Sequence, residues 1–317
     1  MRYAAQRCHG LTPILTFLYS NLTPSPAQSL GLSRQSSMND NRVTRIHSLS
    51  SHASVISIRS PHNYFAAGPE EFAQQNPCIQ GLEYYGRRRD GETGGDFFDF
   101  ISRTAANLAV CMGAAATPGA DSALMVSGIE NLLCSFGAEA ETRPASIIEG
   151  VNRSICVAPG DNSYATLFYA SVDPLRRKLS YVNAGHEPAL LLRKRQSRAI
   201  PLESTGAILG LTHRSSYGQR TIPLEPGDVL AVFSESIAET ADILGRPFGS
   251  TGVLRVLRRC LSAHAADLVE EILDAVERHA GWGIPATDQT VAVVRFTGAR
   301  AEAIPTEAEK ELAFAAA

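Results

Sequence analysis

The side chains best suited to chemistry in this sequence lie where apolar segments end. Asp96 follows two glycines in GETGGDFFDF, so a sharp turn can leave its carboxylate exposed, and His186 lies in the tight AGH turn of VNAGHEPALLL. Glu235 and Glu239 follow the apolar run of LEPGDVLAVFSESIAET, and Asp288 precedes the apolar run of ATDQTVAVVRF. Groups of this kind can act as ligands or in acid–base chemistry.

Each of these residues also has a simple structural explanation. A histidine between a turn glycine and a strand is more often a packing residue than a ligand. Acids at the start of a helix are favoured by the helix dipole whether or not they bind anything. Asp96 after Gly-Gly is a weak signal by itself, so the order of the surrounding segments has to decide between these interpretations.

Short segments rich in aromatic and β-branched residues recur from about Cys78 onward and predict strands. They are GLEYYGRRR, DFFDFISR, NLAVCM, YATLFYASVD, KLSYVNAG, EPALLLRK, YGQRTIPL, DVLAVFSE and QTVAVVRF. Apolar residues at helical spacing instead appear at residues 120–135, 144–157 and 263–280, and Gly281 suits the end of the last of these. Many strands joined by tight turns, with helices grouped in a few places, predict an α+β sandwich and not a βαβ alternation.

The order of the motifs is more specific than any one of them. GGDFFDF, LAVCMGAAATPGADSALM, YVNAGHEPALLL, GAILGL, LEPGDVLAVFSESIAET with RPFG after it, and TDQTVAVVRF follow one another within residues 81–296. This series resembles the SpoIIE-like branch of the metal-dependent, PPM-type serine/threonine protein phosphatases. The resemblance implies a four-layer α-β-β-α sandwich, in which two antiparallel sheets are flanked by helices. It also implies hydrolysis of phosphoserine or phosphothreonine with a pair of Mn2+ or Mg2+ ions held by aspartates.

Carried over position by position, the resemblance implies that Asp96 is the only metal aspartate that is intact. The aspartate of the family's GDVSGHG motif falls on Ala114, because Gly113 and Gly119 match the first and last glycines of that motif with the same spacing. The metal-binding turn after this strand therefore keeps its length and loses its carboxylate.

The remaining metal positions are altered as well. The aspartate of the family's TDG falls on Glu235, a weak match with an extra methylene, and the first aspartate of DDxT falls on Thr287. Asp288 is adjacent to Thr287, but a one-residue shift in an extended segment points a side chain to the opposite face. Asp121 lies at the start of a predicted helix, where capping is the easier explanation, and Gly95 beside Asp96 is the nearby turn glycine.

The resemblance thus implies a catalytically impaired phosphatase domain, with no metal or with weak Mn2+ or Mg2+ binding, and with no side chain assigned a catalytic role. We expect a binding or regulatory module for a protein partner, such as a phosphorylated regulator in bacterial signalling. Two alternatives remain open. One is an active but weakened enzyme in which Asp96, Glu235 and backbone oxygens hold an ion, and the other is a decayed domain kept for assembly.

Composition limits the remaining classes of function. The net charge of −3 over 317 residues gives no indication of nucleic-acid or membrane-surface binding. No apolar run approaches the roughly 20 residues of a membrane span. The six cysteines are scattered without a CxxC pair, which argues against a zinc site and a disulfide framework, so we expect a cytoplasmic protein.

The chain divides into three parts by composition. Residues 1–75 are rich in serine and arginine and poor in acids, which predicts a disordered extension, and Met38 is an alternative start. Residues 76–298 hold the predicted phosphatase-like domain. Residues 299–317 are a short tail, either a short helix or a frayed end, to which we assign no function.

Overall fold

The computed structural model describes the domain predicted for residues 76–298. The described residues are 76, 78–104, 106–116, 120–137, 142–157, 164–195, 198–281 and 283–298. They belong to Arg59–Ala317, one of two units into which the chain divides. The predicted extension at residues 1–75 and the tail at residues 299–317 lie outside the described residues.

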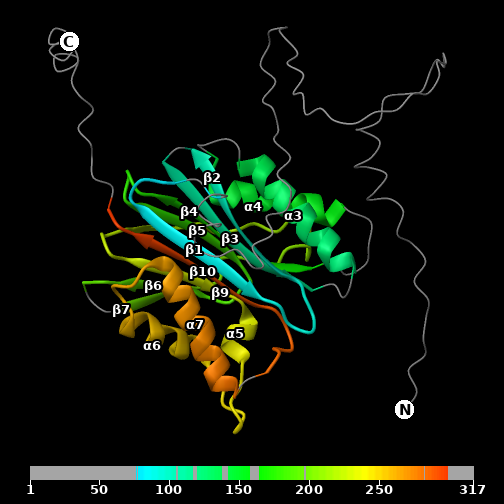
Figure 1. Cartoon of the computed structure of the whole chain (residues 1–317). Coiled ribbons are helices and arrows are strands. Elements are labelled where there is room, and N and C mark those ends of the chain that lie inside the picture. The colour runs from blue at the N-terminus through cyan, green and yellow to red at the C-terminus, as the bar shows by residue number, and fades with distance from the viewer. Residues whose placement is uncertain are drawn as a thin grey trace, which may run out of the picture. The chain divides into compact units, whose positions relative to one another are not determined.

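Two antiparallel sheets form the centre of the domain (Figure 1). The first sheet has the order β1 (Leu82–Arg89), β10 (Gln289–Phe296), β9 (Val229–Phe233), β6 (Ala189–Arg193) and β7 (Arg198–Leu202). The second has the order β2 (Asp96–Thr104), β3 (Asn107–Ala115), β4 (Ala165–Asp173), β5 (Lys178–Ala184) and β8 (Arg220–Pro223).

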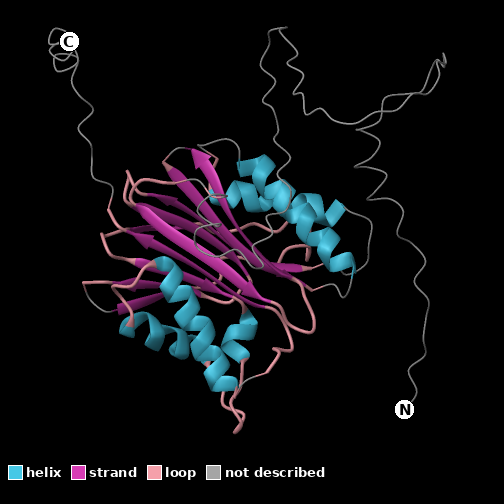
Figure 2. Cartoon of the chain, viewed as in Figure 1, coloured by secondary structure: helices cyan, strands magenta, loops and turns pink. Residues whose placement is uncertain are grey.

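Helices cover the outer face of each sheet, as the colouring of Figure 2 makes plain. The helices α3 (Ala120–Gly137) and α4 (Pro144–Val157) contact the second sheet through β2, β3, β4 and β5. The helices α5 (Glu235–Glu239), α6 (Gly249–Arg259) and α7 (Ala265–Ala280) contact the first sheet through β1, β6 and β10. The domain is therefore a four-layer α-β-β-α sandwich, and the predicted fold class is confirmed.

The alternation of side chains along β2 shows why its sequence forms a central layer. Successive residues of a strand point to opposite faces of the sheet. Phe98 and Phe100 belong to the buried cluster that joins the two sheets, whereas Phe97 and Ile101 belong to the cluster beneath α3 and α4. Both faces of DFFDFI are apolar because both faces are covered.

The structure adds two elements that the sequence patterns did not indicate. The strand β7, with the sequence RAIPL, is only partly buried and pairs with β6 at the end of the first sheet, where Pro201 is tolerated. The helix α6 begins GSTG, which is a poor start for a helix, and is stabilised instead by burial of Val253, Val256 and Leu257. Gly281 has a φ of 82° at the end of α7, which confirms its predicted role.

The GAAATPG segment differs from the expected turn. Gly113, Ala114 and Ala115 continue β3 in full register with β4, so the strand ends three residues later than NLAVCM suggested.

Gly113 is required by its space and not by its φ angle. A Cβ atom there would lie 2.3 Å from the carbonyl oxygen of Thr166 and 2.8 Å from the ring of Phe97. We expect Gly113→Ala to lower the free energy of unfolding by about 2–3 kcal/mol, because a packed backbone has to move.

Gly128→Ala in α3 is the matched control, since no atom lies within 4 Å of its added Cβ. Urea unfolding should show that Gly128→Ala leaves the free energy of unfolding unchanged or raises it by up to about 1 kcal/mol. Equal effects of the two changes would contradict the packing argument.

Candidate phosphatase site

Asp96, Ala114 and Thr166 lie in a row across three neighbouring strands. Asp96 begins β2 directly after Gly95, and Ala114 on β3 is paired with Asp96 on one side and with Thr166 on the other. Residues paired in this way project to the same face of a sheet. A methyl group therefore occupies the position between the Asp96 carboxylate and the Thr166 hydroxyl.

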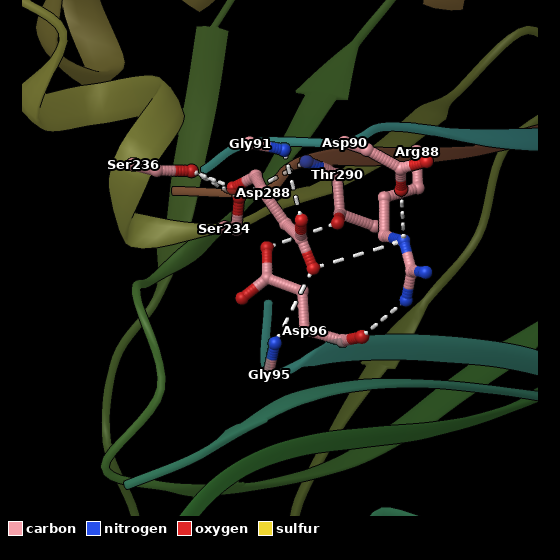
Figure 3. A network of polar contacts seen from close by, with 9 residues as sticks. All are labelled: Arg88, Asp90, Gly91, Gly95, Asp96, Ser234, Ser236, Asp288 and Thr290. Carbon is pink, nitrogen blue, oxygen red and sulfur yellow. Dashed lines mark hydrogen bonds and ion pairs between the residues drawn. The ribbon is translucent and has the colours of Figure 1, made fainter. Parts of the chain in front are cut away.

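Asp288 lies beside Asp96 (Figure 3). Its Oδ1 accepts a hydrogen bond from Gly91 N at 3.0 Å, and its Oδ2 accepts one from Gly95 N at 3.3 Å. The guanidinium of Arg88 adds an ion pair, with Nε 3.8 Å from Oδ2. Only 4% of Asp288 is exposed, and its oxygens are committed to the turn between β1 and β2.

The expectation for Thr287 and Asp288 is confirmed in one respect and wrong in another. The two side chains do point in opposite directions, since Thr287 is exposed and Asp288 is buried. The face that Asp288 occupies, however, is the one that contains Asp96. Thr287 instead forms an isolated bridge with Thr93 at the rim.

The carboxyl group of Asp96 is partly buried at the start of β2. Its Oδ2 accepts a hydrogen bond from Thr290 Oγ1 at 2.9 Å. Burial raises the pKa of Asp96 to about 6, the hydrogen bonds of Thr290 and Ser234 oppose that rise, and the neighbouring charge of Asp288 adds to it. Arg88 donates from Nη1 to the backbone oxygen of Asp96 at 2.8 Å and not to its carboxylate.

The start of α5 is joined to this group through hydroxyls. Ser236 Oγ donates to the backbone oxygen of Asp288, and Ser234 Oγ accepts from Thr290 N at 3.0 Å. Glu235 between them is exposed. The structure therefore brings Asp96, Gly95 and Asp288 together and leaves Glu235 at the surface.

A group of four glutamates lies at this end of the domain. Burial raises the pKa of Glu187, and the charges of Glu235, Glu203 and Glu239 raise it further. We call Glu187, Glu203, Glu235 and Glu239 the acidic rim. It gives the site end a negative field.

His186 has the structural role that the sequence favoured. Its backbone N donates to Asn183 Oδ1 at 2.8 Å, and Asn183 Nδ2 donates back to the His186 carbonyl oxygen at 3.0 Å. The ring Nδ1 lies 3.1 Å from Thr166 Oγ1. Burial lowers the pKa of His186 to about 4, so the imidazole is neutral and fixes the turn after β5.

The residues present do not fit a pair of divalent ions. Among the described residues, no group of three or more His, Cys, Asp or Glu is arranged to hold a metal ion. Asp288 is committed to backbone amides and Arg88, and the position opposite Asp96 is Ala114. Hard cations of this kind need several oxygen ligands each, and Asp96 alone does not supply them.

Sequence reasoning missed the polar residues that connect these acids. Arg88 is the middle residue of a run of three arginines, and Thr290 and Ser234 lie in apolar strand segments. Their residue types give no signal of a site, because they contact Asp96 and Asp288 only once the fold brings β1, β2, β9 and β10 together. The side chain of Asp121 lies outside the described part of the chain.

This sandwich, with its acids at the ends of β2 and β10, defines a PPM-type phosphatase domain. Residues 104–297 match the family described as Stage II sporulation protein E (SpoIIE), and the chain belongs to this family. It is a SpoIIE-like domain of a kind that acts in signalling.

Known relatives agree with this assignment. The chain is 25% identical over 186 residues to the phosphoserine phosphatase RsbU of Bacillus subtilis, covering 57% of this chain and 53% of RsbU. The chain thus spans about half the length of that relative. The solved RsbU and RsbW domains of Rv1364c from Mycobacterium tuberculosis share the fold with a TM-score of 0.61 and 24% identity, over 71% of this chain and 62% of that one.

A solved relative with metal shares the fold as well. The catalytic domain of the serine/threonine protein phosphatase PstP, in complex with two manganese ions, has a TM-score of 0.51 and 14% identity, over 68% of this chain and 97% of that one. Within the described ranges of the present chain, none of the helices combines the length and the apolar character needed to cross a membrane.

The burial of His186 predicts a specific dependence of stability on pH. Its pKa is lower in the folded state than in the unfolded state, so its contribution is complete above about pH 6.5 and is lost as the pH falls toward about 4. We expect a slope of up to about 1.4 kcal/mol per pH unit in this window, which His186→Gln removes. Urea unfolding at several pH values measures the slope. The exposed His213→Gln is the control and should keep the slope of the unmodified protein, and an unchanged slope in His186→Gln would contradict this account.

Proposed function

We propose that this SpoIIE-like domain is a catalytically impaired phosphatase that acts as a binding or regulatory module. The observation that carries the proposal is the pairing of Ala114 with Asp96 across β2 and β3. A methyl group stands where the family places a carboxylate, in the middle of the site and not at its rim. Loss of such a ligand removes the catalyst itself, because in a two-metal site the ions activate the water and stabilise the phosphoryl oxygens.

The state of Asp288 supports the same conclusion. Its carboxylate lies beside Asp96, and its position next to Thr287 makes it the candidate to replace a ligand there. Both of its oxygens accept hydrogen bonds from backbone amides, and Arg88 lies within ion-pair distance. Release of Asp288 toward a metal would leave those buried amides without partners, which is unfavourable by about 1–3 kcal/mol for each group.

The partner is proposed from the relatives. RsbU is named as a phosphoserine phosphatase, so a phosphorylated regulatory protein is the natural ligand for a domain with the same scaffold. The five described cysteines are free, which supports the cytoplasm as the compartment. The domain would hold such a partner without hydrolysing it.

The second candidate is an active Mn2+- or Mg2+-dependent serine/threonine phosphatase of low turnover. The acidic rim favours it, because Glu187, Glu203, Glu235 and Glu239 would concentrate cations near Asp96. In this case Asp96, Glu235 and backbone oxygens would hold a single ion.

Metal binding separates the two candidates. We expect isothermal titration of Mn2+ into the full chain to show no saturable binding. We also expect its hydrolysis of an aryl phosphate to equal that of Asp96→Asn, which keeps the Thr290 contact but lacks the charge. Saturable Mn2+ binding together with turnover well above that of Asp96→Asn would overturn the impaired state and favour the second candidate.

Restoration tests the assignment of positions. We expect Ala114→Asp, Glu235→Asp and Thr287→Asp together to give Mn2+-dependent turnover at least about 100-fold above the starting chain, because these are the positions at which the resemblance places the family's metal aspartates. The same variant with Asp96→Asn is the control and should lose that gain. A restored protein that folds by circular dichroism and still binds no Mn2+ would show that the carried-over positions are wrong.

A further inference from the structure

The end of the sandwich away from the candidate site is built around one crossing turn. Residues 224–228 carry the chain from β8 in the second sheet to β9 in the first. Leu224 N donates to the Arg177 carbonyl oxygen at 2.8 Å, and Gly227 N donates to the Phe296 carbonyl oxygen at 2.6 Å. The side chain of Lys194 covers Gly227, where an added Cβ would lie 2.3 Å from Lys194 Cδ. The turns after β4, β6 and β8 and the end of β10 therefore meet here.

This end of the domain is basic. Its exposed cations are Arg176, Arg177, Lys194, Arg195 and Arg198, which we call the basic edge. Two of them have acidic neighbours, since Arg176 lies 3.3 Å from Asp173 and Arg195 lies 3.8 Å from Glu225.

Three cations of the basic edge have no acidic partner within 4.0 Å in the described part of the chain. They are Arg177, Lys194 and Arg198. Arg198 is also paired directly across the hairpin with Arg193, and the buried Asp228 that neutralises Arg193 accepts a hydrogen bond from Glu225 N as well. Because Arg177, Lys194 and Arg198 are not neutralised by an acid of the described chain, an external anion would stabilise this edge.

The chain itself supplies such an anion from the same place. After β10 ends at Phe296, Gly298 lies against the crossing turn, where an added Cβ would be 3.2 Å from Pro226 Cγ. Figure 1 shows the end of β10 on the same side of the domain as the β6–β7 hairpin. The sequence that follows Gly298, ARAEAIPTEAEKEL, contains Glu302, Glu307, Glu309 and Glu311 against Arg300 and Lys310, and within residues 302–311 Lys310 is the one cation.

We infer that the basic edge binds the acidic segment of residues 302–311 of its own chain. A residue of extended chain spans at most about 3.5 Å, so the four residues from Gly298 to Glu302 reach about 14 Å and the later glutamates reach further. Exposed ion pairs are individually worth about 0.2–1 kcal/mol, but tethering gives the segment an effective concentration in the millimolar range. The contact is therefore salt-sensitive, and an acidic partner protein could displace the segment.

The position of the contact keeps it apart from the candidate site. Thr290 marks the site end of β10 and Phe296 its other end, and six residues of strand span about 20 Å. The docked segment would thus occupy the basic edge while the site end stays open. This inference does not depend on whether the site is active.

A zero-length carbodiimide cross-linker tests the inference in the full chain, because it joins a lysine amine to a carboxylate only in direct contact. The lysines of the sequence are Lys178, Lys194 and Lys310, so the products are few. We expect mass spectrometry at low salt to find Lys194 joined to a glutamate of residues 302–311, with a yield several-fold lower in 0.5 M NaCl because the Debye length falls to about 4 Å.

Charge reversal provides the matched comparison. The double variant Arg177→Glu with Arg198→Glu keeps Lys194 and should lower the cross-link yield at least about 5-fold. The control is Arg143→Glu with Arg153→Glu, which changes the net charge by the same amount at α4, away from the basic edge. The control should leave the cross-link yield unchanged. A mixture of ¹⁵N-labelled and unlabelled chains shows whether the bound segment belongs to the same chain or to a second copy. Cross-linked peptides of uniform label support the inference. Cross-linked peptides that combine a labelled and an unlabelled half identify a second copy and overturn it. Recovery of both peptides without any cross-link between them would also overturn it.

Discussion

The contact between Asp288 and the turn of residues 91–95 is the interaction on which the site end of this domain depends. Asp288 precedes β10 in the first sheet, and the amides of Gly91 and Gly95 belong to the connection that leads into β2 in the second. A buried carboxylate that accepts two backbone hydrogen bonds, with Arg88 beside it, links the first sheet to the connection that enters the second. The direction in which Asp96 projects follows from this contact.

Under the proposed assignment of the metal positions, the same contact would let this site lose metal ligands and remain folded. In a cluster of carboxylates, mutual repulsion is relieved by cations, and without ions such a cluster is unfavourable. Here Ala114 removes one carboxylate, Asp288 is neutralised by amides and Arg88, and Asp96 responds to burial with a raised pKa. These polar groups are paired with one another, so under the proposed function the scaffold of a SpoIIE-like domain would not depend on the charge balance that ions supply.

The two ends of the sandwich differ in charge, and the strands that join them are apolar. The acidic rim lies at the site end, and the basic edge lies at the other. A net charge of −3 conceals this polarity completely. Partners of opposite charge would therefore be directed to different ends, which suits a domain that works by binding.

The local patterns of the sequence determined most of the architecture. Segments rich in aromatic and β-branched residues predicted the strands, and both faces of DFFDFI and LFYASV are apolar because a different layer covers each face. Apolar residues at helical spacing predicted α4 and α7, and Gly281 marked the end of α7. The strand β7 and the helix α6 could not be predicted, since a poor local preference is overridden by pairing and burial that the chain forms only when folded.

For the site, the sequence by itself determined which acid is retained and which position has become alanine, because motif order and spacing are properties of the chain. Only the tertiary structure decided that Asp288 faces Asp96 and that Thr287 and Glu235 face solvent. It also decided that Arg88 and Thr290 support the acids. Those outcomes depend on where β1, β2, β9 and β10 meet, and contacts between residues about 200 positions apart leave no local pattern to read.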